Sequence, residues 1–396
     1  MILGAGLFAQ TSFAAVSVGL AALAPALRSH YRLSLGEIGV VLGAVSIGML
    51  PTLLPWGLLA DRFSERSVIA LGLGGGGVAV GVAGTTHSFS ALVGWLIVAG
   101  ALGASVNAAS GRAVMWWFGA HERGLALGIR QTAIPIGGAA AAAGLPWLAS
   151  AGGTRLAFFV LGGGCIAGAL VATALMREAP PHDPELGDVT RPARDPRMWL
   201  LAGGSALYLT AQIGVTGFVV LFLHEHRGVS AHSAAALLAG INVLGIGARI
   251  GTGRWSDRVR TRLEPLRTIG LALTVGTAAV AAFVDAPLGV LVPALVVAGV
   301  LSLAWNALSF TAAAEAAGAT RSGAALGFQQ TLLGVVSAIV PPAFAAIVVA
   351  SSWRVAFALA ALGPLLGVVA LRKVPEPTPT GGARRPGTSA IPPAAR

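Results

Sequence analysis

Uncharged, apolar stretches dominate this chain and constrain its fold more than any other feature. A membrane core of ~30 Å needs about 20 apolar residues per helix, and each stretch is long enough to cross one. One stretch is too long for a single crossing and is divided by the polar turn signal Gly84-Thr85-Thr86-His87-Ser88. The sequence therefore predicts twelve transmembrane helices, within residues 1–27, 38–60, 67–111 (two helices), 131–154, 156–176, 198–223, 228–248, 268–284, 286–314, 322–353 and 355–371.

The composition excludes a water-soluble enzyme. Only 10% of the residues are charged and 55% are hydrophobic, whereas soluble domains carry roughly 25% charged residues. Apolar residues lie on all sides of these segments, and lipid requires the backbone to satisfy its own hydrogen bonds, so we expect an all-α integral membrane protein. The sequence has no nucleotide-binding loop, no metal-ligand spacing and a single cysteine, Cys165. We expect no cofactor and no enzymatic activity.

The basic residues predict the orientation in the membrane. With a cytoplasmic N-terminus, 18 of the 26 Lys and Arg residues lie in cytoplasmic loops and the tail, 5 lie in outer loops, and Arg112, Arg130 and Arg249 lie within spans. The positive-inside rule therefore predicts a multi-pass protein of the cell membrane with both termini in the cytoplasm. The net charge of +11 is spread in short clusters between apolar stretches, which argues against nucleic acid as a partner.

The chain repeats itself in two halves. The segment Gly57-Leu58-Leu59-Ala60-Asp61-Arg62 follows the second span, and Gly253-Arg254-Trp255-Ser256-Asp257-Arg258 follows the eighth, 196 residues later. Ser34 and Ser230 keep that offset, and Asn107 and Asn306 are 199 residues apart. Parallel six-span repeats build two bundles with a substrate path between them. We predict an N-terminal six-helix bundle over 1–176, a cytoplasmic linker over 177–197, a C-terminal six-helix bundle over 198–372 and a disordered cytoplasmic tail over 373–396.

These two loops resemble the Gly-x-x-x-Asp-Arg-x-Gly-Arg-Arg signature of the major facilitator superfamily of secondary transporters. The loop departs from that signature at Ser64 and Glu65. The resemblance extends over nearly the whole chain and implies transport without ATP, by rocking of the two bundles. It also implies that Asp61 meets the start of span eleven, and Asp257 the start of span five near Gly124, as gates that break during the cycle. The residues expected in these gates are Gly57, Asp61, Arg62, Gly253, Asp257 and Arg258.

Two further features resemble the small-anion branch of that superfamily, which carries monocarboxylates, oxalate, formate, nitrate or cyanate. Trp117-Phe118 precedes Glu122-Arg123-Gly124, and Arg249 lies four residues before Gly253, where the carboxylate porters place a substrate-pairing arginine. The Asp that monocarboxylate porters place four residues before this arginine is Gly245 here. The oxalate type adds a Lys on span eleven, whereas this chain has Gln329 and Gln330. We therefore expect a monoanion, with a proton or a counter-anion as coupling partner. Facilitated exchange or uniport is favoured over direct proton symport.

Arginines within spans suggest the same cargo on physical grounds. An arginine near a helix centre costs about 2.5–3.5 kcal/mol on insertion scales, so it faces the bundle interior unless it can snorkel. No Asp, Glu or Lys lies deep in any span. Arg249, and with less weight Arg130, would then take an anionic substrate as counter-ion, bound through two parallel hydrogen bonds of the guanidinium fork. The alternative is that both arginines snorkel to the cytoplasmic interface.

Neutral polar residues complete the predicted site. The resemblance implies that spans one, four, seven and ten line the cavity, and the strongest candidates there are Asn107, Asn306, Tyr208, Gln212 and Trp305, with Gln10 also present. Each of them could equally make an interhelical hydrogen bond.

We therefore predict a monomeric secondary carrier of a small organic monoanion. Two alternatives stay open: a drug exporter of the same superfamily, and a membrane-embedded ligand sensor that transports nothing.

Overall fold

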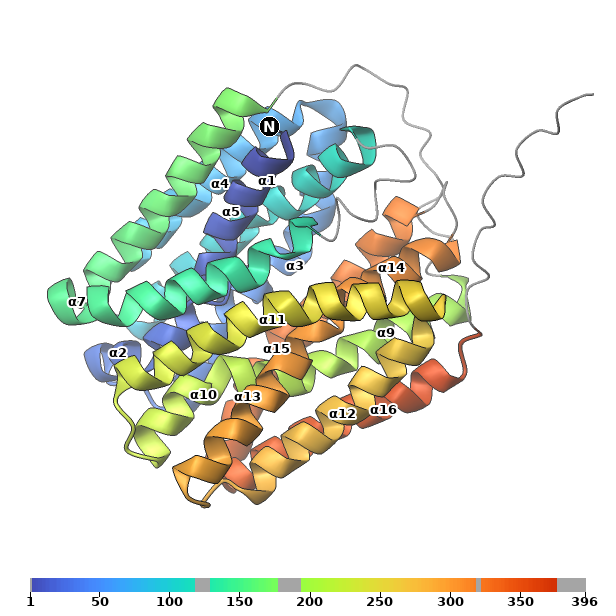
Figure 1. Ribbon diagram of the computed structural model, residues 1–396. Helices are drawn as coiled ribbons and strands as arrows, with labels where there is room; N and C mark the ends of the chain where they lie inside the picture. The colour runs from blue at the N-terminus through green and yellow to red at the C-terminus, as the bar shows by residue number, and fades with distance from the viewer. Residues whose placement is uncertain (1, 118–128, 177–193, 318–321, 376–396) are drawn as a thin grey trace, which may run out of the picture.

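The computed structural model describes residues 2–117, 129–176, 194–317 and 322–375 of the chain, and Figure 1 shows its course. Every regular element in these ranges is helical. The first half contains α1 (Ile2–Ser17), α2 (Leu20–Tyr31), α3 (Leu35–Arg62), α4 (Glu65–Ala83), α5 (Phe89–Trp117) and α7 (Ala133–Leu175). The second half contains α9 (Pro196–Gln212), η1 (Ile213–Gly217), α10 (Phe218–Leu221), η2 (Phe222–His226), α11 (Ala231–Val259), α12 (Leu263–Ala282), α13 (Leu288–Ala304), α14 (Asn306–Ala317), α15 (Ser322–Ala350) and α16 (Trp353–Arg372).

The number of membrane crossings agrees with the prediction of twelve. In the described ranges, eleven helical segments are long and apolar enough to cross a membrane. One of them, Ile129–Leu175, has 47 residues, which corresponds to about 70 Å at 1.5 Å per residue and is enough for two crossings. It is kinked at Gly152 and at Gly153, whose φ of 71° is left-handed. The predicted boundary between spans five and six, at Arg155, lies two residues from this kink.

Equivalent serines begin equivalent helices in the two halves. The Ser34 Oγ accepts a hydrogen bond from the Glu37 N–H at 3.2 Å, and the Glu37 carboxylate accepts one from the Ser34 N–H at 2.7 Å. The Ser230 Oγ accepts from the Ser233 N–H at 3.1 Å. Side-chain caps of this kind satisfy N–H groups that a helix start leaves unpaired. The 196-residue repeat is therefore visible in the structure at the start of α3 and of α11.

The two halves meet through two equivalent pairs of helices. Within the first half, α1 packs on α7 and α5 packs on α3 and α4; within the second, α16 packs on α9 and α12, and α13 packs on α11 and α12. Between the halves, α3 packs on α15 and α7 packs on α11, which correspond to spans two with eleven and five with eight (Figure 1).

We use two names for the ends of the molecule. The linker end is where α3, α11 and α16 finish and α9 starts. The hairpin end holds the short connections after α2, α4, η2, α12 and α15.

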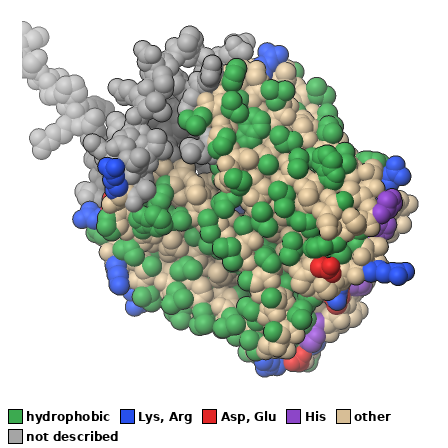
Figure 2. Space-filling model, turned by 180° about the vertical axis from the view of Figure 1, so that it is seen from behind, with side chains coloured by type: hydrophobic (Ala, Val, Ile, Leu, Met, Phe, Trp, Pro, Cys, Tyr) green, Lys and Arg blue, Asp and Glu red, His purple; other side chains and the backbone are tan. Residues whose placement is uncertain are grey.

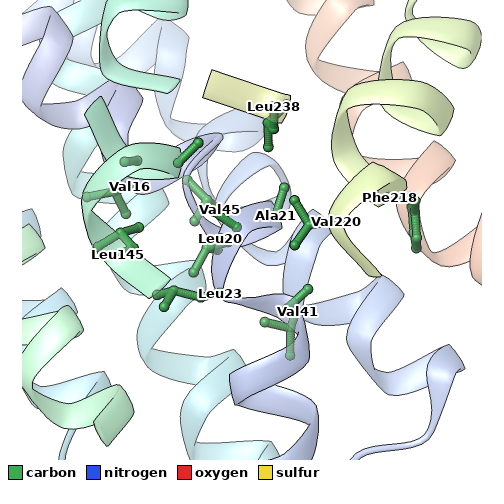
Figure 3. Packing of buried hydrophobic residues seen from close by; sticks show 14 of the residues in the cluster. Val16, Leu20, Ala21, Leu23, Val41, Val45, Leu145, Phe218, Val220 and Leu238 are labelled. Atoms are coloured by element: carbon green, nitrogen blue, oxygen red, sulfur yellow. The ribbon is translucent and has the colours of Figure 1, made fainter. Parts of the chain in front are cut away.

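Toward the hairpin end, one apolar core joins the halves. Val16, Leu20, Leu23, Val41, Val45 and Leu145 of the first half belong to the same buried cluster as Phe218, Val220 and Leu238 of the second (Figure 3). The other buried cluster, which includes Met198, Leu266 and Leu371, draws only on the second half among the described residues. The halves are thus closed against each other toward the hairpin end.

The outer surface is apolar, as a lipid-facing surface must be. Figure 2 shows a broad area of hydrophobic and uncharged side chains, with charged side chains concentrated toward its margins. Leu71, Leu170, Val275 and Val349 are each at least 65% exposed, whereas Arg249, Asn306 and Gln329 are buried. This pattern reverses the usual arrangement of a soluble protein.

The predicted linker and tail lie mainly outside the described residues, namely at 177–193 and 376–396. The predicted linker extended to residue 197, but α9 already begins at Pro196, where the Asp195 Oδ1 accepts a hydrogen bond from the Arg197 N–H at 2.9 Å.

Candidate functional site

Arg249 of α11 bridges the two halves of the molecule. Its side chain is buried, with 4% of the residue exposed. The Nε donates to the Leu303 carbonyl of α13 at 2.8 Å, and Nη1 donates to the Gln131 carbonyl of the first half at 2.5 Å. The Nη2 is buried and has no hydrogen-bond partner among the described residues. Arg249 therefore does not snorkel to an interface, and one of its donors remains available to an acceptor.

A break in span ten explains two of the bonds around Arg249. The helix is interrupted at Trp305, between α13 and α14, so carbonyls near the end of α13 lose their usual helical partners. The Arg249 Nε takes the Leu303 carbonyl, and the Thr252 Oγ donates to the Ala304 carbonyl at 3.0 Å. Neither carbonyl, nor Thr252, could be identified from the sequence, because an apolar run gives no signal for such a break.

These contacts bear on the predicted anion site at Arg249, which stays a prediction. We expected its guanidinium to bind an anion through two parallel hydrogen bonds. Two of the three nitrogens of the guanidinium already donate to backbone carbonyls. Nη1 and Nη2 carry two N–H groups each, so a fork through these two nitrogens stays open, whereas a fork through Nε does not.

Arg130 lies beside the contact that Arg249 makes between the two halves. It is half-buried and precedes Gln131, the residue that Arg249 contacts. Its Nη2 donates to the Asn107 carbonyl of α5 at 3.0 Å. The two arginines singled out in the sequence thus come from different halves and are connected through the backbone of residues 130 and 131.

Two amide pairs occupy equivalent places in the two halves. In the first, the Gln10 Nε2 of α1 donates to the Asn107 Oδ1 of α5 at 2.8 Å. In the second, the Asn306 Nδ2 of α14 donates to the Gln212 Oε1 of α9 at 3.3 Å. These helices belong to spans one and four, and to spans seven and ten. Together with the contacts of Arg130 and Arg249, the first pair forms a chain of hydrogen bonds from α1 to α13 across the contact between the halves. The chain ends at Leu303, and Asn306 lies three residues further along the sequence.

Tyr208 and Trp305 lie inside the packing of the second half. Neither is exposed, and their rings meet edge to face with centroids 5.5 Å apart. The Tyr208 hydroxyl donates to the Leu266 carbonyl of α12 at 3.1 Å. Tyr208 also fills the space beside Gly270 and Gly367, where an added Cβ would lie 2.0 Å and 2.7 Å from its side chain. In this conformation both aromatic residues support the helices rather than line the junction between the halves.

The predicted gate residues lie at the linker end. Asp61 and Arg62 are the last residues of α3, and their side chains, like the start of span five near Gly124, lie outside what the structure describes. Gly57 faces open space. Gly253 is part of α11, and Asp257 and Arg258 are exposed near its end.

Asp257 contacts its own half in this structure. Its Oδ1 accepts from the Arg262 Nη1 at 2.6 Å, and the Arg262 Nη2 pairs with the Glu315 Oε1 at 3.1 Å. Burial lowers the pKa of Arg262, but the hydrogen bond to Asp257 and the charge of Glu315 outweigh it and raise that pKa. The network links α11, α14 and the start of α12. The contact between Asp257 and span five stays a prediction.

Comparison with known proteins identifies the family. A family model described as Major Facilitator Superfamily matches residues 5–341. The chain belongs to this superfamily. An uncharacterized MFS-type transporter of Mycobacterium tuberculosis is 32% identical over 373 residues, which cover 93% of this chain and 84% of that protein. A probable sulfoacetate transporter of Cupriavidus necator is 26% identical over 387 residues, which cover 89% of this chain and 88% of that one.

Solved structures of major facilitator proteins share the fold. A D-xylose-proton symporter matches with a TM-score of 0.78 and 15% identity, over 95% of this chain and 98% of that one. A bacterial homolog of the human lysosomal transporter Spinster, in an inward-facing and occupied conformation, matches with a TM-score of 0.72 and 18% identity, over 94% of both chains. The family, the relatives and these structures are all transporters. This major facilitator protein is therefore a multi-pass membrane protein built for secondary transport of a small molecule.

Proposed function

We propose that this transporter carries a small organic monoanion, such as a monocarboxylate, a sulfonate or cyanate, through the junction between its halves. The observation that carries the proposal is the buried Arg249, with its unpaired Nη2. The family supplies the transport mechanism, and Arg249 supplies the preference for a negative cargo.

The charge of Arg249 supports this cargo. Among the residues that the structure describes, no acidic side chain forms an ion pair with Arg249. A buried charge that lacks an opposite charge is costly, and a buried donor left unpaired adds to that cost. An anion at Nη2 offsets both costs, whereas a cation or an apolar drug offsets neither.

The geometry also limits the side from which the cargo can approach Arg249. Because Nε and one N–H of Nη1 are occupied, the cargo would bind Nη2, alone or together with the second N–H of Nη1. The amides of Asn107, Gln212 and Asn306 would hold the remainder of the molecule, since amides can both donate and accept hydrogen bonds. The probable sulfoacetate transporter among the relatives supports an anionic cargo but not a single charge, because sulfoacetate carries both a sulfonate and a carboxylate.

The coupling partner we propose is a counter-anion. A proton-coupled carrier of this branch would place a carboxylate at position 245. Here Gly245 packs on Leu303, and an added Cβ would lie 2.5 Å from the Leu303 Cδ1. Exchange of one anion for another needs no titratable group at that position.

We also propose that the linker end faces the cytoplasm, in line with the distribution of Lys and Arg. The described conformation would then be closed toward the outside of the cell. We keep the proposed division into a bundle over 1–176 and a bundle over 198–372, in a monomer.

Flux into proteoliposomes tests the proposal. Labelled monocarboxylates, sulfoacetate, cyanate and a cationic dye are compared for the wild type, Arg249→Ala and Arg249→Lys. We expect uptake of at least one anion, loss of that uptake with Ala and partial retention with Lys, because Lys keeps the positive charge. Arg254→Ala is the matched control, since Arg254 lies on the same helix but is exposed near its end.

Other outcomes contradict the proposal. Dye transport that Arg249→Ala leaves intact, without anion uptake, would identify a drug exporter. Saturable anion binding without flux would identify a sensor. Equal losses in the Arg249 and Arg254 variants would show that the total charge, and not the buried guanidinium, determines uptake.

A further inference from the structure

An ion pair connects the two halves at the hairpin end. The Arg28 Nη1, near the end of α2, contacts the Glu225 Oε2 of η2. Both side chains are partly buried, with 32% and 25% exposed. They lie at the same end as the apolar core that joins the halves, close in sequence to Leu23 of the first half and Val220 of the second (Figure 3).

The two partners come from corresponding places in the repeat. The Arg28 Nε donates to the Leu33 carbonyl at 3.0 Å, and the His224 Nδ1 lies 2.9 Å from the Val229 carbonyl. Arg28 and His224 are 196 residues apart, as are Leu33 and Val229, and this is the offset of Ser34 and Ser230. Each half therefore closes its first hairpin-end turn in the same way, and Glu225 is the neighbour of the residue that corresponds to Arg28.

This symmetry explains why the ion pair spans the halves. Corresponding positions next to the axis that relates two parallel repeats lie close to each other. Here one repeat offers a cation and the other an anion, so the pair is attractive only while the two turns are together. η2 is a π-helix, a form that is frequent at functional sites, and it carries Glu225 at this contact.

We propose that Arg28 and Glu225 form a latch that stabilises closure of the hairpin end and breaks in each transport cycle. The proposal depends on the rocking of the halves, which the family implies, and not on the identity of the cargo. Among the ion pairs between described residues, that of Arg28 and Glu225 joins the two halves, whereas the others lie within the second half.

The test measures the distance across the hairpin end without cargo. Spin labels are placed at His87→Cys and His232→Cys, both exposed at this end, in a Cys165→Ala background that removes the only native cysteine. Glu225→Gln keeps the size of the side chain and removes its charge. We expect this change to raise the ratio of the open to the closed hairpin end about two- to fivefold, as loss of a partly exposed ion pair should.

Two further variants make the test specific. Arg28→Glu combined with Glu225→Arg restores the opposite charges, and we expect it to return the distance distribution toward that of the wild type. Arg32→Gln removes an exposed charge four residues from Arg28, for which the structure describes no ion pair, and we expect no shift.

An unchanged distribution in Glu225→Gln, or no recovery in the doubly reversed variant, would overturn the latch. A shift of equal size in Arg32→Gln would also overturn it, because the effect would then come from total charge. Since no anion is added, the result is independent of the flux experiment, and a failed anion assay would leave it intact.

Discussion

At the scale of single residues, the sequence revealed the burial of Arg249 but not its hydrogen-bond partners. Its position in an otherwise uncharged span predicted a buried guanidinium. The carbonyls it contacts belong to Gln131 and Leu303, which are 118 and 54 residues away in the chain. No local pattern reports such contacts, because they arise from the packing of three helices. The same limit applies to Tyr208, whose polar hydroxyl suggested a ligand contact but bonds to Leu266.

Tyr208→Phe tests this structural role. The substitution removes the hydroxyl that donates to the Leu266 carbonyl and leaves the ring contact with Trp305 in place. We expect the free energy of unfolding to fall by about 0.5–1.5 kcal/mol, the typical value of one hydrogen bond. Thermal unfolding in detergent measures this loss. Anion uptake per folded molecule should be unchanged, and a selective loss of uptake would place Tyr208 in the substrate site.

Asp285, between α12 and α13, gives a pH-dependent prediction. Hydrogen bonds from Arg354 at 3.0 Å and from His226 at 3.1 Å lower the pKa of its carboxyl. Because the folded pKa is lowered, the ionised carboxylate stabilises the protein above the unfolded pKa of about 3.9 and loses this effect as the pH falls through the folded pKa.

Melting curves of the wild type and Asp285→Asn should therefore differ slightly at pH 7, with the wild type more stable, and should converge as the pH falls below the folded pKa of Asp285. Asp285 and Arg354 are both exposed, so the difference in Tm between the two proteins should be small, about 1 °C. A difference that grows as the pH falls below the unfolded pKa of about 3.9 would contradict the assignment.

At the scale of helices, the sequence predicted how many there are better than it predicted their shape. Uncharged intervals defined the twelve crossings because charge is excluded from the membrane core. They could not show that span one divides into α1 and α2, that span ten breaks at Trp305, or that span seven contains two π-helical turns. A continuous apolar segment is compatible with each of these backbones, and neighbouring helices determine which one forms.

The crossing of α3 and α15 yields a prediction about Gly39. A Cβ at this position would lie 2.6 Å from the Ala345 Cβ, 2.8 Å from the Pro341 carbonyl oxygen and 2.9 Å from the Pro342 Cα. Because two of these atoms belong to the backbone, Gly39→Ala must push the helices apart toward the hairpin end. We expect a larger open fraction in the spin-label measurement and lower thermal stability.

Gly36→Ala is the matched control for Gly39→Ala. It lies one turn earlier on α3, and the nearest atom to an added Cβ, the Ser34 Oγ, is 4.0 Å away. Alanine is a better helix former than glycine, so Gly36→Ala should leave the protein unchanged or slightly more stable. Equal effects of the two substitutions would show that the close approach of α15 does not matter.

At the scale of the whole molecule, duplication is the feature that the sequence conveyed most fully. The repeated loops, serines and asparagines predicted two equivalent halves, and the structure shows the equivalence in helix caps, amide pairs and interhelical contacts. The differences between the repeats carry the functional hypotheses. Arg130 in the first half corresponds to Gln329 in the second, and Arg28 and Glu225 bear opposite charges. We propose that the cargo and the latch depend on such departures, which the fold does not determine.

Equilibrium binding of the transported anion to the purified protein tests whether the Arg249 guanidinium holds the cargo. The account predicts that Arg249→Ala weakens binding about tenfold to a hundredfold, the value of a hydrogen bond to a charged group, while Arg254→Ala binds like the wild type. Thermal unfolding without the anion confirms that each variant is folded. Equal affinity of the wild type and a folded Arg249→Ala variant would contradict the claim that this guanidinium holds the cargo.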